Sequence, residues 1–420
     1  MRRSIRFILF LALLPGMGIW AQEVPPGADV AGLLTLARQN NPELAGMRHE
    51  AQAALERVAP AAALPDPRFS MELRDLTRFG EQSASLSPAR VGSTRYALQQ
   101  DLPWFGKREL RRDIAQLEAD AATARAQGSW TELAARIKSV HVQRYFLERN
   151  AQLAQEVLDL VKRLEQVAQG RYSSALGPQQ DVIRAQVEQS AMRSELVALE
   201  GEGHHLMARL NALLARPVSA PLSAPQQLRA LPASSELDPL VLQERQRAIN
   251  PALQAEQLRV QAAQKARELG LRNRYPDFTV GLAPIQYRNA IKEWELMVEL
   301  TIPLQQSTRR AQERESEAML SAAMARREAL ANLVQSELSE NLAAIEVARR
   351  NEALVASSLL PQAELTLQSA LAAYENGKVD FATLLDAQRQ IRQAKQSRIK
   401  TQLEAHLRLI EVERLLGEDL

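Results

Sequence analysis

The chain has 420 residues, of which 46% are hydrophobic and 24% charged, and its formal net charge is only +2. This balance argues against a nucleic-acid-binding protein, and the absence of cysteine excludes disulfides, thiolate catalysis, cysteine-ligated metals and a lipid-modified N-terminal cysteine. Aromatic residues make up only 4%, which is low for the core of a large globular enzyme and typical of long, Ala- and Leu-rich helices.

Residues 1–21 have the pattern of a secretory signal peptide. Arginines precede the short apolar run Phe7–Leu14, and Ala21 fits the cleavage point. Retention of this segment as a membrane anchor is the alternative. No second apolar run reaches the roughly 18 residues of a spanning helix, so we expect an exported chain that enters a membrane only as a β-barrel.

The rest of the chain contains one pattern twice. Asn41-Pro42-Glu43-Leu44 recurs as Asn250-Pro251-Ala252-Leu253, and further matches follow in the same order. They are Pro67-Arg68-Phe69 with Pro276-Asp277-Phe278, Leu102-Pro103 with Ile302-Pro303, Tyr172 with Tyr374, Ala185-Gln186 with Ala387-Gln388, and Leu213-Leu214 with Leu415-Leu416. We therefore predict two structural repeats, 22–216 and 240–420, joined by the Pro-, Ser- and Ala-rich linker 217–239.

Each repeat is predicted to begin with a helix and two strands. Asn41 before Pro42, and Asn250 before Pro251, are helix caps followed by a first-turn proline. Apolar and polar residues then alternate with a period of two. The alternating runs are Phe69–Arg74, Arg95–Leu102, Phe278–Ala283 and Glu293–Ile302. Their length, up to about ten residues, suits a tilted membrane-spanning strand, and a soluble hairpin is the alternative.

A very long helix follows each pair of strands. Apolar residues recur in three-four steps from Trp130 to Val161, as in a heptad seam, with Arg144 as the exception. As one helix, Lys107–Gln169 would extend on the order of 95 Å. The second long helix is predicted over Thr308–Tyr374, where Pro361 indicates a kink or local adjustment. Return helices over Gln179–Leu214 and Phe381–Leu416 complete two antiparallel hairpins.

Four membrane-length strands cannot close a barrel, because even small barrels need about eight. Open sheet edges are not tolerated in lipid, so either the strands are soluble or several chains share one barrel. Three chains would supply about twelve strands and a matching set of helices, and a hollow tube running from barrel to helices is the simplest solution.

With these elements in place, the chain resembles the TolC-like outer-membrane factors of Gram-negative tripartite efflux systems. The resemblance rests on the duplicated Asn-Pro helix starts, on Tyr374-x-x-Gly377 running into Phe381–Gln388, and on the paired Leu-Leu helix ends. The junction Leu102–Arg108 (LPWFGKR) is most similar to the heavy-metal branch, the outer-membrane partners of cobalt–zinc–cadmium and copper exporters.

The resemblance implies a mainly α fold with a small β part: a trimeric α-helical tunnel crossing the periplasm beneath a shared 12-stranded outer-membrane β-barrel. It implies a homotrimer in outer-membrane lipid that docks to a periplasmic adaptor protein and an inner-membrane RND pump. The implied function is passive conduction of substrate, with heavy-metal cations favoured, to the exterior. A multidrug or type I secretion duct of the same fold is one alternative, and a soluble periplasmic coiled-coil scaffold is another.

The resemblance also assigns residues at the periplasmic entrance. Asp181 and Tyr374 fall at gate-locking positions, and Asp386 falls at an acidic constriction ring. The implied adaptor-docking tips are Ser174, Ala175, Leu176, Asn376, Gly377 and Lys378, with Ala175 and Lys378 departing from the family's small-Gly-Leu pattern. From the residues alone, Asp181 could serve the helix dipole, Asp386 could be a solvated charge, and Tyr374 could be a packing residue.

No catalytic, cofactor or metal site is predicted. The chain has no P-loop, no Gly-x-Ser-x-Gly and no zinc-protease motif. Of the five histidines, His204 and His205 are adjacent and would point about 100° apart on a helix, which disfavours chelation of one ion. His406 recurs at the position of His204, which indicates packing. The energy for transport would have to come from a partner.

Overall fold

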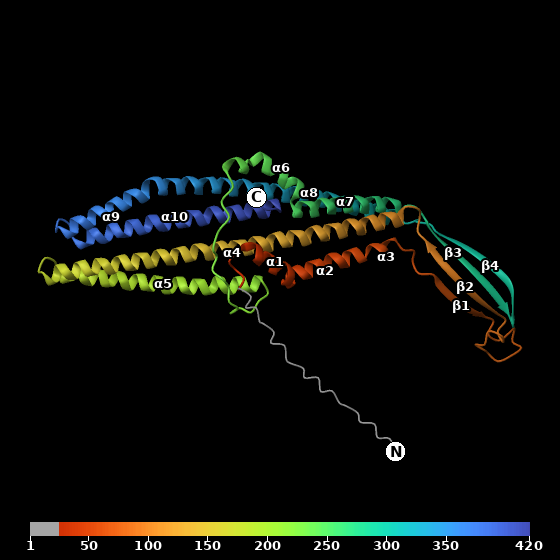
Figure 1. Ribbon diagram of the computed structural model, residues 1–420. Coiled ribbons are helices and arrows are strands. Elements are labelled where there is room, and N and C mark those ends of the chain that lie inside the picture. Colours follow the sequence, from red (N-terminus) through yellow and green to blue (C-terminus); the bar gives the residue numbers. More distant parts are fainter. Residues whose placement is uncertain (1–24) are drawn as a thin grey trace, which may run out of the picture.

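The computed structural model describes residues 25–420, so the predicted signal peptide 1–21 lies outside the described residues. The molecule is elongated, with two long helical hairpins at one end and a small sheet at the other (Figure 1). The first half contains α1 (Val30–Asn40), α2 (Pro42–Glu56), α3 (Val58–Ala62), β1 (Arg68–Arg74), β2 (Ser93–Leu102), α4 (Lys107–Ser173) and α5 (Gln179–Leu213). The second half contains η1 (Ser234–Leu237), α6 (Pro239–Ile249), α7 (Pro251–Arg272), β3 (Asp277–Tyr287), β4 (Ala290–Thr301), α8 (Gln306–Leu354), the π-helical turn η2 (Val355–Leu359), α9 (Leu360–Glu375) and α10 (Phe381–Leu416). The prediction of a mainly helical fold with a small β part is confirmed.

The two asparagine caps make the same pair of bonds in both halves. Asn41 accepts from the Leu44 amide at 3.1 Å and donates its own amide to the Leu213 carbonyl at 2.8 Å. Asn250 accepts from the Leu253 amide at 2.8 Å and donates to the Leu415 carbonyl at 2.8 Å. Each asparagine therefore starts one helix and holds the end of the return helix, which explains why Asn-Pro and Leu-Leu recur together in the sequence.

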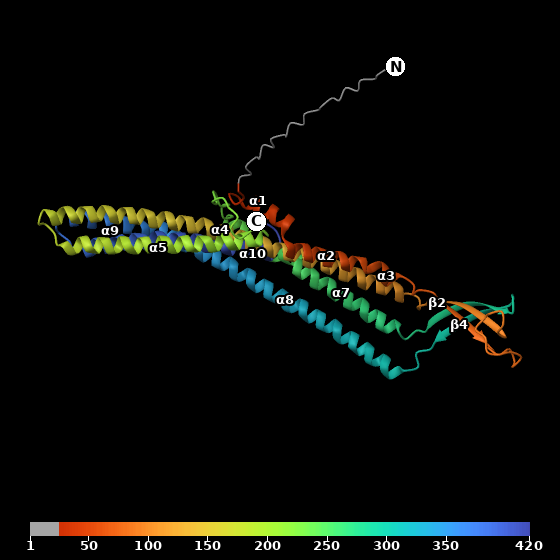
Figure 2. The same ribbon diagram turned by 90° about the horizontal axis from the view of Figure 1, so that it is seen from below.

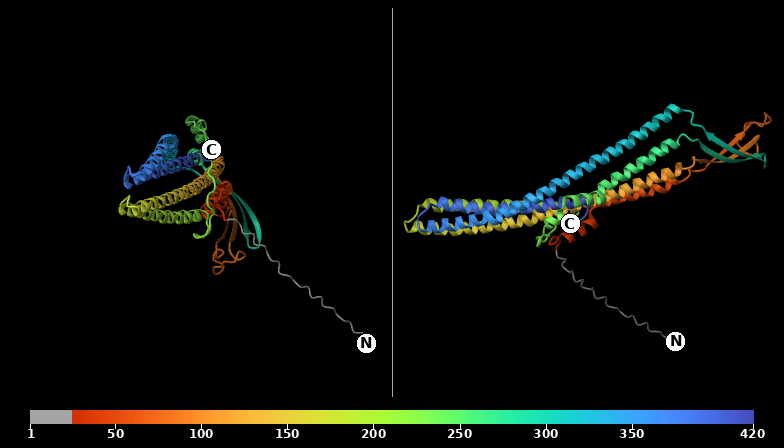
Figure 3. Two further views of the ribbon diagram at one scale, coloured as in Figure 1. Left: turned by 60° about the vertical axis from the view of Figure 1, so that its left-hand side comes forward. Right: turned by 90° about the horizontal axis from the view of Figure 1, so that it is seen from above.

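The helical hairpins lie side by side (Figures 1 and 3). Helix α4 packs on α5 and on α10, and α10 packs on α8 and α9, so α5 and the α8–α9 helix are the two outer edges. Most apolar residues of the predicted seam are buried, with Trp130, Leu147 and Ala151 half-buried, and Arg144 is buried with them. Its guanidinium donates to the Ser223 carbonyl at 3.1 Å, so this exception in the heptad pattern ties the linker to α4. The turn η2 precedes Pro361 and is the adjustment predicted for that proline.

The sheet has the order β1-β2-β3-β4 and is antiparallel throughout. One face carries a row of paired residues, Phe69, Leu98, Leu282 and Leu296, which are between 48% and 72% exposed. We call this side of the sheet the apolar face. On the other side Arg95 is buried between Glu295, at 2.8 Å, and Glu72, at 3.4 Å. In the described part of the chain, none of the helices combines the length and hydrophobicity needed to cross a membrane.

A buried ion pair joins the sheet to the helices. Lys107, the first residue of α4, is only 3% exposed and donates to the Asp277 carboxylate at 2.8 Å and to the Tyr275 carbonyl at 2.9 Å. The Trp104 amide donates to the same carboxylate at 2.8 Å. Between them Gly106 has φ +81°, and a Cβ there would lie 1.5 Å from the Arg272 guanidinium. The left-handed backbone therefore favours glycine here, and any larger residue would also displace the Arg272 guanidinium.

Candidate functional site

The tips of the two helical hairpins have the same backbone design. At the first tip the Leu176 amide donates to the Arg171 carbonyl at 2.8 Å, and at the second the Lys378 amide donates to the Ala373 carbonyl at 2.8 Å. Both bonds close a Schellman motif, the helix end in which an amide bonds to the carbonyl five residues earlier. This motif needs a residue with left-handed backbone angles just before the donating amide. Gly377 supplies it with φ +69°, whereas Ala175 adopts φ +56° at the equivalent place. Replacing the expected glycine by Ala175 therefore leaves the turn intact but strained.

Exchanging the residue types at these two turns is expected to change stability in opposite directions. Ala175→Gly should stabilise its tip and Gly377→Ala should destabilise the other, each by about 1 kcal/mol, because the left-handed conformation costs L-residues roughly 1–2 kcal/mol. The measurement is hydrogen exchange of the Leu176 and Lys378 amides. Faster exchange of the Leu176 amide in Ala175→Gly would show that this turn is not strained by its alanine.

A buried hydrogen bond links the two tips. The Tyr374 hydroxyl donates to the Asp181 carboxylate at 3.0 Å, and Tyr374 is only 2% exposed. Burial, and next the bond to the Asp181 carboxylate, raise the pKa of Tyr374 to about 12. Tyr374 also packs on the ring of Phe381, with centroids 5.3 Å apart. The structure thus brings together Asp181 and Tyr374, two of the three residues predicted at the gate.

Arg171 completes this contact and was not predicted from the sequence. Its guanidinium donates to the Glu375 carbonyl of the second tip at 2.8 Å and to the Leu176 carbonyl of the first at 2.9 Å. The same group lies 5.0 Å from the centre of the Tyr374 ring, within cation–π range. We call Arg171, Asp181 and Tyr374 the tip lock. Arg171 has no counterpart in the second repeat, where Ala373 stands, so the internal comparison gave no signal for it.

Asp386 is not part of the tip lock. Its side chain is 68% exposed, and its nearest cation is Arg389 at 3.7 Å. Arg389 is bonded more closely, at 2.8 Å, to the buried Glu188. Because Arg389 is bonded more closely to Glu188, it compensates the charge of the exposed Asp386 only in part.

The predicted docking residues occupy the outermost turns. All six of them are exposed, and Leu176 presents a bare apolar side chain. Asn376 uses its side-chain amide to close its own turn, by donating to the Ala372 carbonyl at 2.7 Å. Among the described residues, none covers the rest of the tip surface, so a partner protein could contact it.

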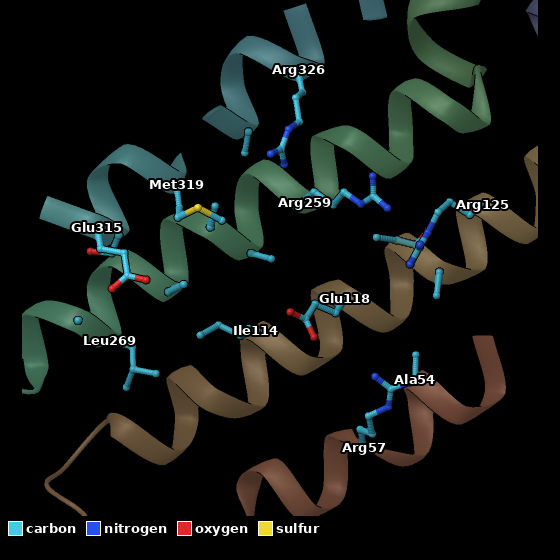
Figure 4. Close-up of a pocket in the computed structure, with 18 of the residues that line it drawn as sticks. Ala54, Arg57, Ile114, Glu118, Arg125, Arg259, Leu269, Glu315, Met319 and Arg326 are labelled. Atoms are coloured by element: carbon cyan, nitrogen blue, oxygen red, sulfur yellow. The ribbon is translucent and has the colours of Figure 1, made fainter. Parts of the chain in front are cut away.

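A pocket lies between the helices nearer the sheet. Residues of α2, α4, α7 and α8 surround a pocket of about 840 Å³ (Figure 4). Its charged residues include Arg57, Arg125, Arg259 and Arg326, with Glu118 and Glu315 among them. Across residues 25–420, no three His, Asp or Glu side chains are grouped closely enough to hold a metal ion. This wall is charged with both signs, so it can be wetted without holding one kind of ion tightly.

Both halves of the chain match one known protein family. The family model described as outer membrane efflux protein matches residues 33–216 and 242–418. The cobalt-zinc-cadmium resistance protein CzcC of Cupriavidus metallidurans is 24% identical over 403 residues, which cover 95% of this chain and 92% of that protein.

Solved structures agree in fold. CusC, whose structures are described as relating to folding and transmembrane channel formation, superposes with a TM-score of 0.77 at 18% identity, covering 93% of this chain and 92% of that one. The outer membrane protein VceC of Vibrio cholerae superposes with a TM-score of 0.79 at 16% identity, covering 93% and 96%. The outer-membrane channel OprN superposes with a TM-score of 0.78 at 20% identity, covering 92% and 89%.

Proposed function

The chain belongs to the outer membrane efflux protein family, and we propose that it is the passive exit duct through which heavy-metal cations leave a tripartite pump. It is an outer-membrane channel protein whose helices extend into the periplasm. The observation that carries the choice of cargo is the similarity to a cobalt-zinc-cadmium resistance protein over nearly the full length of both chains. The chain supplies the passage, and the inner-membrane RND pump supplies the energy.

The working unit of this proposal is a homotrimer, and the outer edges of the helical hairpins support it. Each edge exposes large apolar side chains at positions that one copy does not cover. They are Ile183, Val187 and Val197 on α5, and Val347, Leu354 and Leu365 on α8 and α9. An α5 edge packed on the α8–α9 edge of the next copy would bury both sets, and three copies would join their sheets along β1 and β4 into the predicted twelve-stranded barrel.

The trimer is expected to fractionate with outer membranes and to persist in mild detergent. Each copy buries two apolar edges in the trimer, and each Å² of apolar surface removed from water stabilises the assembly by about 25 cal/mol. Separating the copies would expose this surface again, so we expect dissociation to be slow. Analytical ultracentrifugation of the detergent extract measures the stoichiometry. Recovery of the processed chain as a water-soluble monomer would contradict the trimer and favour a periplasmic scaffold.

At the periplasmic end we assign the tip lock to the closed gate and the six exposed tip residues to the adaptor. The lock closes an internal contact between the two hairpins, which is what an entrance must break to open. Leu176 gives the adaptor an apolar contact and Lys378 gives it a positive charge.

The exposed carboxylate of Asp386 is proposed to form the acidic ring of the constriction. Three such carboxylates in a narrow pore attract cations and repel anions. We expect Asp386→Asn to weaken block by divalent cations severalfold and to reduce cation selectivity in single-channel recordings. Glu328→Gln, an exposed glutamate on α8 far from the tips, is the matched control. If both variants keep wild-type block, Asp386 does not line the constriction.

The cargo is tested directly in cells. A strain lacking this chain should become sensitive to cobalt, zinc and cadmium, and the wild-type gene should restore resistance. The same strain is challenged with dyes and detergents. Unchanged metal resistance with increased dye sensitivity would replace the metal cargo by a multidrug one and leave the duct in place.

A further inference from the structure

An amphipathic patch lies where the middle of the sheet meets the helices. We call Trp104, Phe105, Arg272, Tyr275 and Phe278 the junction patch. Trp104 stacks on Tyr275, with centroids 5.2 Å apart and planes 9° apart, and on Phe278, with centroids 5.4 Å apart. Phe105 is 79% exposed beside them. The rings are thus fixed against one another while part of their apolar surface faces outward.

Two cations lie near these rings, and they differ in their partners: Lys107, on the Tyr275 carbonyl, is paired with Asp277, whereas Arg272 has no carboxylate partner among the described residues. Arg272 is exposed and donates to the Phe105 carbonyl at 3.1 Å, and it makes no ion pair with any described residue. Its neighbour Arg274, in contrast, is paired with Glu313. The patch therefore combines aromatic rings with one uncompensated guanidinium, the group that binds phosphate through parallel N–H donors.

The position of the patch decides what can cover it. Phe278 pairs with Leu300 and with Leu102, so the patch continues the apolar face toward the helices. The patch lies at the helix ends of the central strands, in the β2–α4 and α7–β3 connections and at the start of β3, whereas another copy of the chain would join along β1 or β4. In the membrane placement of the proposed function, the end of the sheet that joins the helices (Figure 2) lies at the leaflet that faces the periplasm, and the patch is at that end.

We propose that the junction patch binds an anionic phospholipid of the periplasm-facing leaflet, with the rings against the glycerol and upper acyl chains and Arg272 on the phosphate. This inference rests on the membrane placement in the proposed function. Trp and Tyr favour the membrane–water interface because one end of each ring is apolar and the other polar. Free phosphate would satisfy Arg272 but would leave the rings in water, so the lipid is the better ligand.

The placement is tested by quenching of single tryptophans. Variants that retain only Trp104, Trp130 or Trp294, with the other tryptophans replaced by Phe, are reconstituted as trimers in phosphatidylethanolamine–phosphatidylglycerol vesicles brominated near the headgroup. Trp104 should lose emission, Trp294 on the apolar face should also lose emission, and Trp130 in the helical region should not. Quenching of Trp294 without Trp104 would overturn this inference alone. Absence of quenching at Trp294 as well would overturn the membrane placement.

The headgroup contact is tested by Arg272→Gln in the otherwise unchanged chain. The affinity for phosphatidylglycerol, measured by native mass spectrometry of the trimer, should fall about fivefold for loss of one basic group. Arg326→Gln, an exposed arginine of the helical wall, is the matched control. Equal affinities of Arg272→Gln and wild type, or displacement of the lipid by millimolar inorganic phosphate, would contradict the assignment.

Discussion

Replacing Tyr374 by phenylalanine is expected to open the periplasmic entrance. The change removes one hydroxyl and almost no volume, so the ring still packs on Phe381. What is lost is the only donor recorded on the buried Asp181 carboxylate within the described residues, and an unsatisfied buried acceptor costs about 1–3 kcal/mol. Since 1.4 kcal/mol is a factor of about ten in an equilibrium, three weakened locks should shift the trimer strongly toward open tips.

Single-channel recording in planar bilayers measures this shift as a higher conductance of the resting channel, and entry of a large antibiotic into cells measures it in vivo. Tyr172→Phe is the matched control, because Tyr172 is the tyrosine of the first repeat at the same turn and is exposed. Equal conductance of the two variants would exclude Tyr374 from the gate.

The contribution of the Tyr374 hydroxyl to the tip lock is expected not to change with pH in the neutral range. The pKa of Tyr374 is raised from 10.0 to about 12 in the folded chain. A raised pKa stabilises the folded state fully below the unfolded value, and this contribution is lost as pH rises from about 10 through about 12. The conductance difference between wild type and Tyr374→Phe should therefore stay constant between neutral pH and about pH 9. A difference that vanishes by pH 8 would contradict the bond as the source.

Asp277→Ala is expected to give the largest loss of stability. It leaves the Lys107 ammonium buried with one carbonyl partner and removes the acceptor of the Trp104 amide. Breaking a buried ion pair by deleting one partner costs about 3–5 kcal/mol, whereas deleting one side of an exposed pair costs under about 1 kcal/mol. Since Asp277 itself is 44% exposed, the lower end of the range is expected.

Denaturant unfolding followed by circular dichroism measures the free energy. Arg274→Ala breaks the nearby exposed pair with Glu313 and is the control. The double variant Lys107→Met/Asp277→Ala carries no unpaired buried charge and should recover part of the loss. If Asp277→Ala loses no more than Arg274→Ala, the buried pair does not hold the junction.

Local sequence periods and the internal duplication were enough to predict the strands, the long helices and both asparagine caps. These patterns suffice because the period of a strand or helix lies within one element, and each asparagine cap recurs at the same place in both halves. The tip residues Asp181 and Tyr374 were assigned by resemblance, and the structure adds their bond. Whether that bond gates a channel stays a prediction.

Other features could not be predicted because they depend on contacts between distant segments. Arg171 acts on carbonyl groups of both tips, and a backbone acceptor leaves no trace in the sequence. In the sequence, Arg144 only interrupts a heptad seam. Its role becomes clear from the structure, where its guanidinium donates to the Ser223 carbonyl. The second bond of Asn41 is likewise made to a carbonyl, that of Leu213, at the far end of its repeat.

The paired bonds of Asn41 and Asn250 have a mechanical consequence. Each asparagine fixes the base of a return helix, and because α5 and α10 also pack along α4, turning about that base involves the whole helical hairpin. With 35 residues, α5 is about 50 Å long, and a rotation of only about 10° at its base would carry its tip roughly 9 Å. In the proposed channel, small changes of angle at the Asn41 and Asn250 bonds would therefore change the aperture of the entrance, and loosening either asparagine should broaden the distribution of pore sizes.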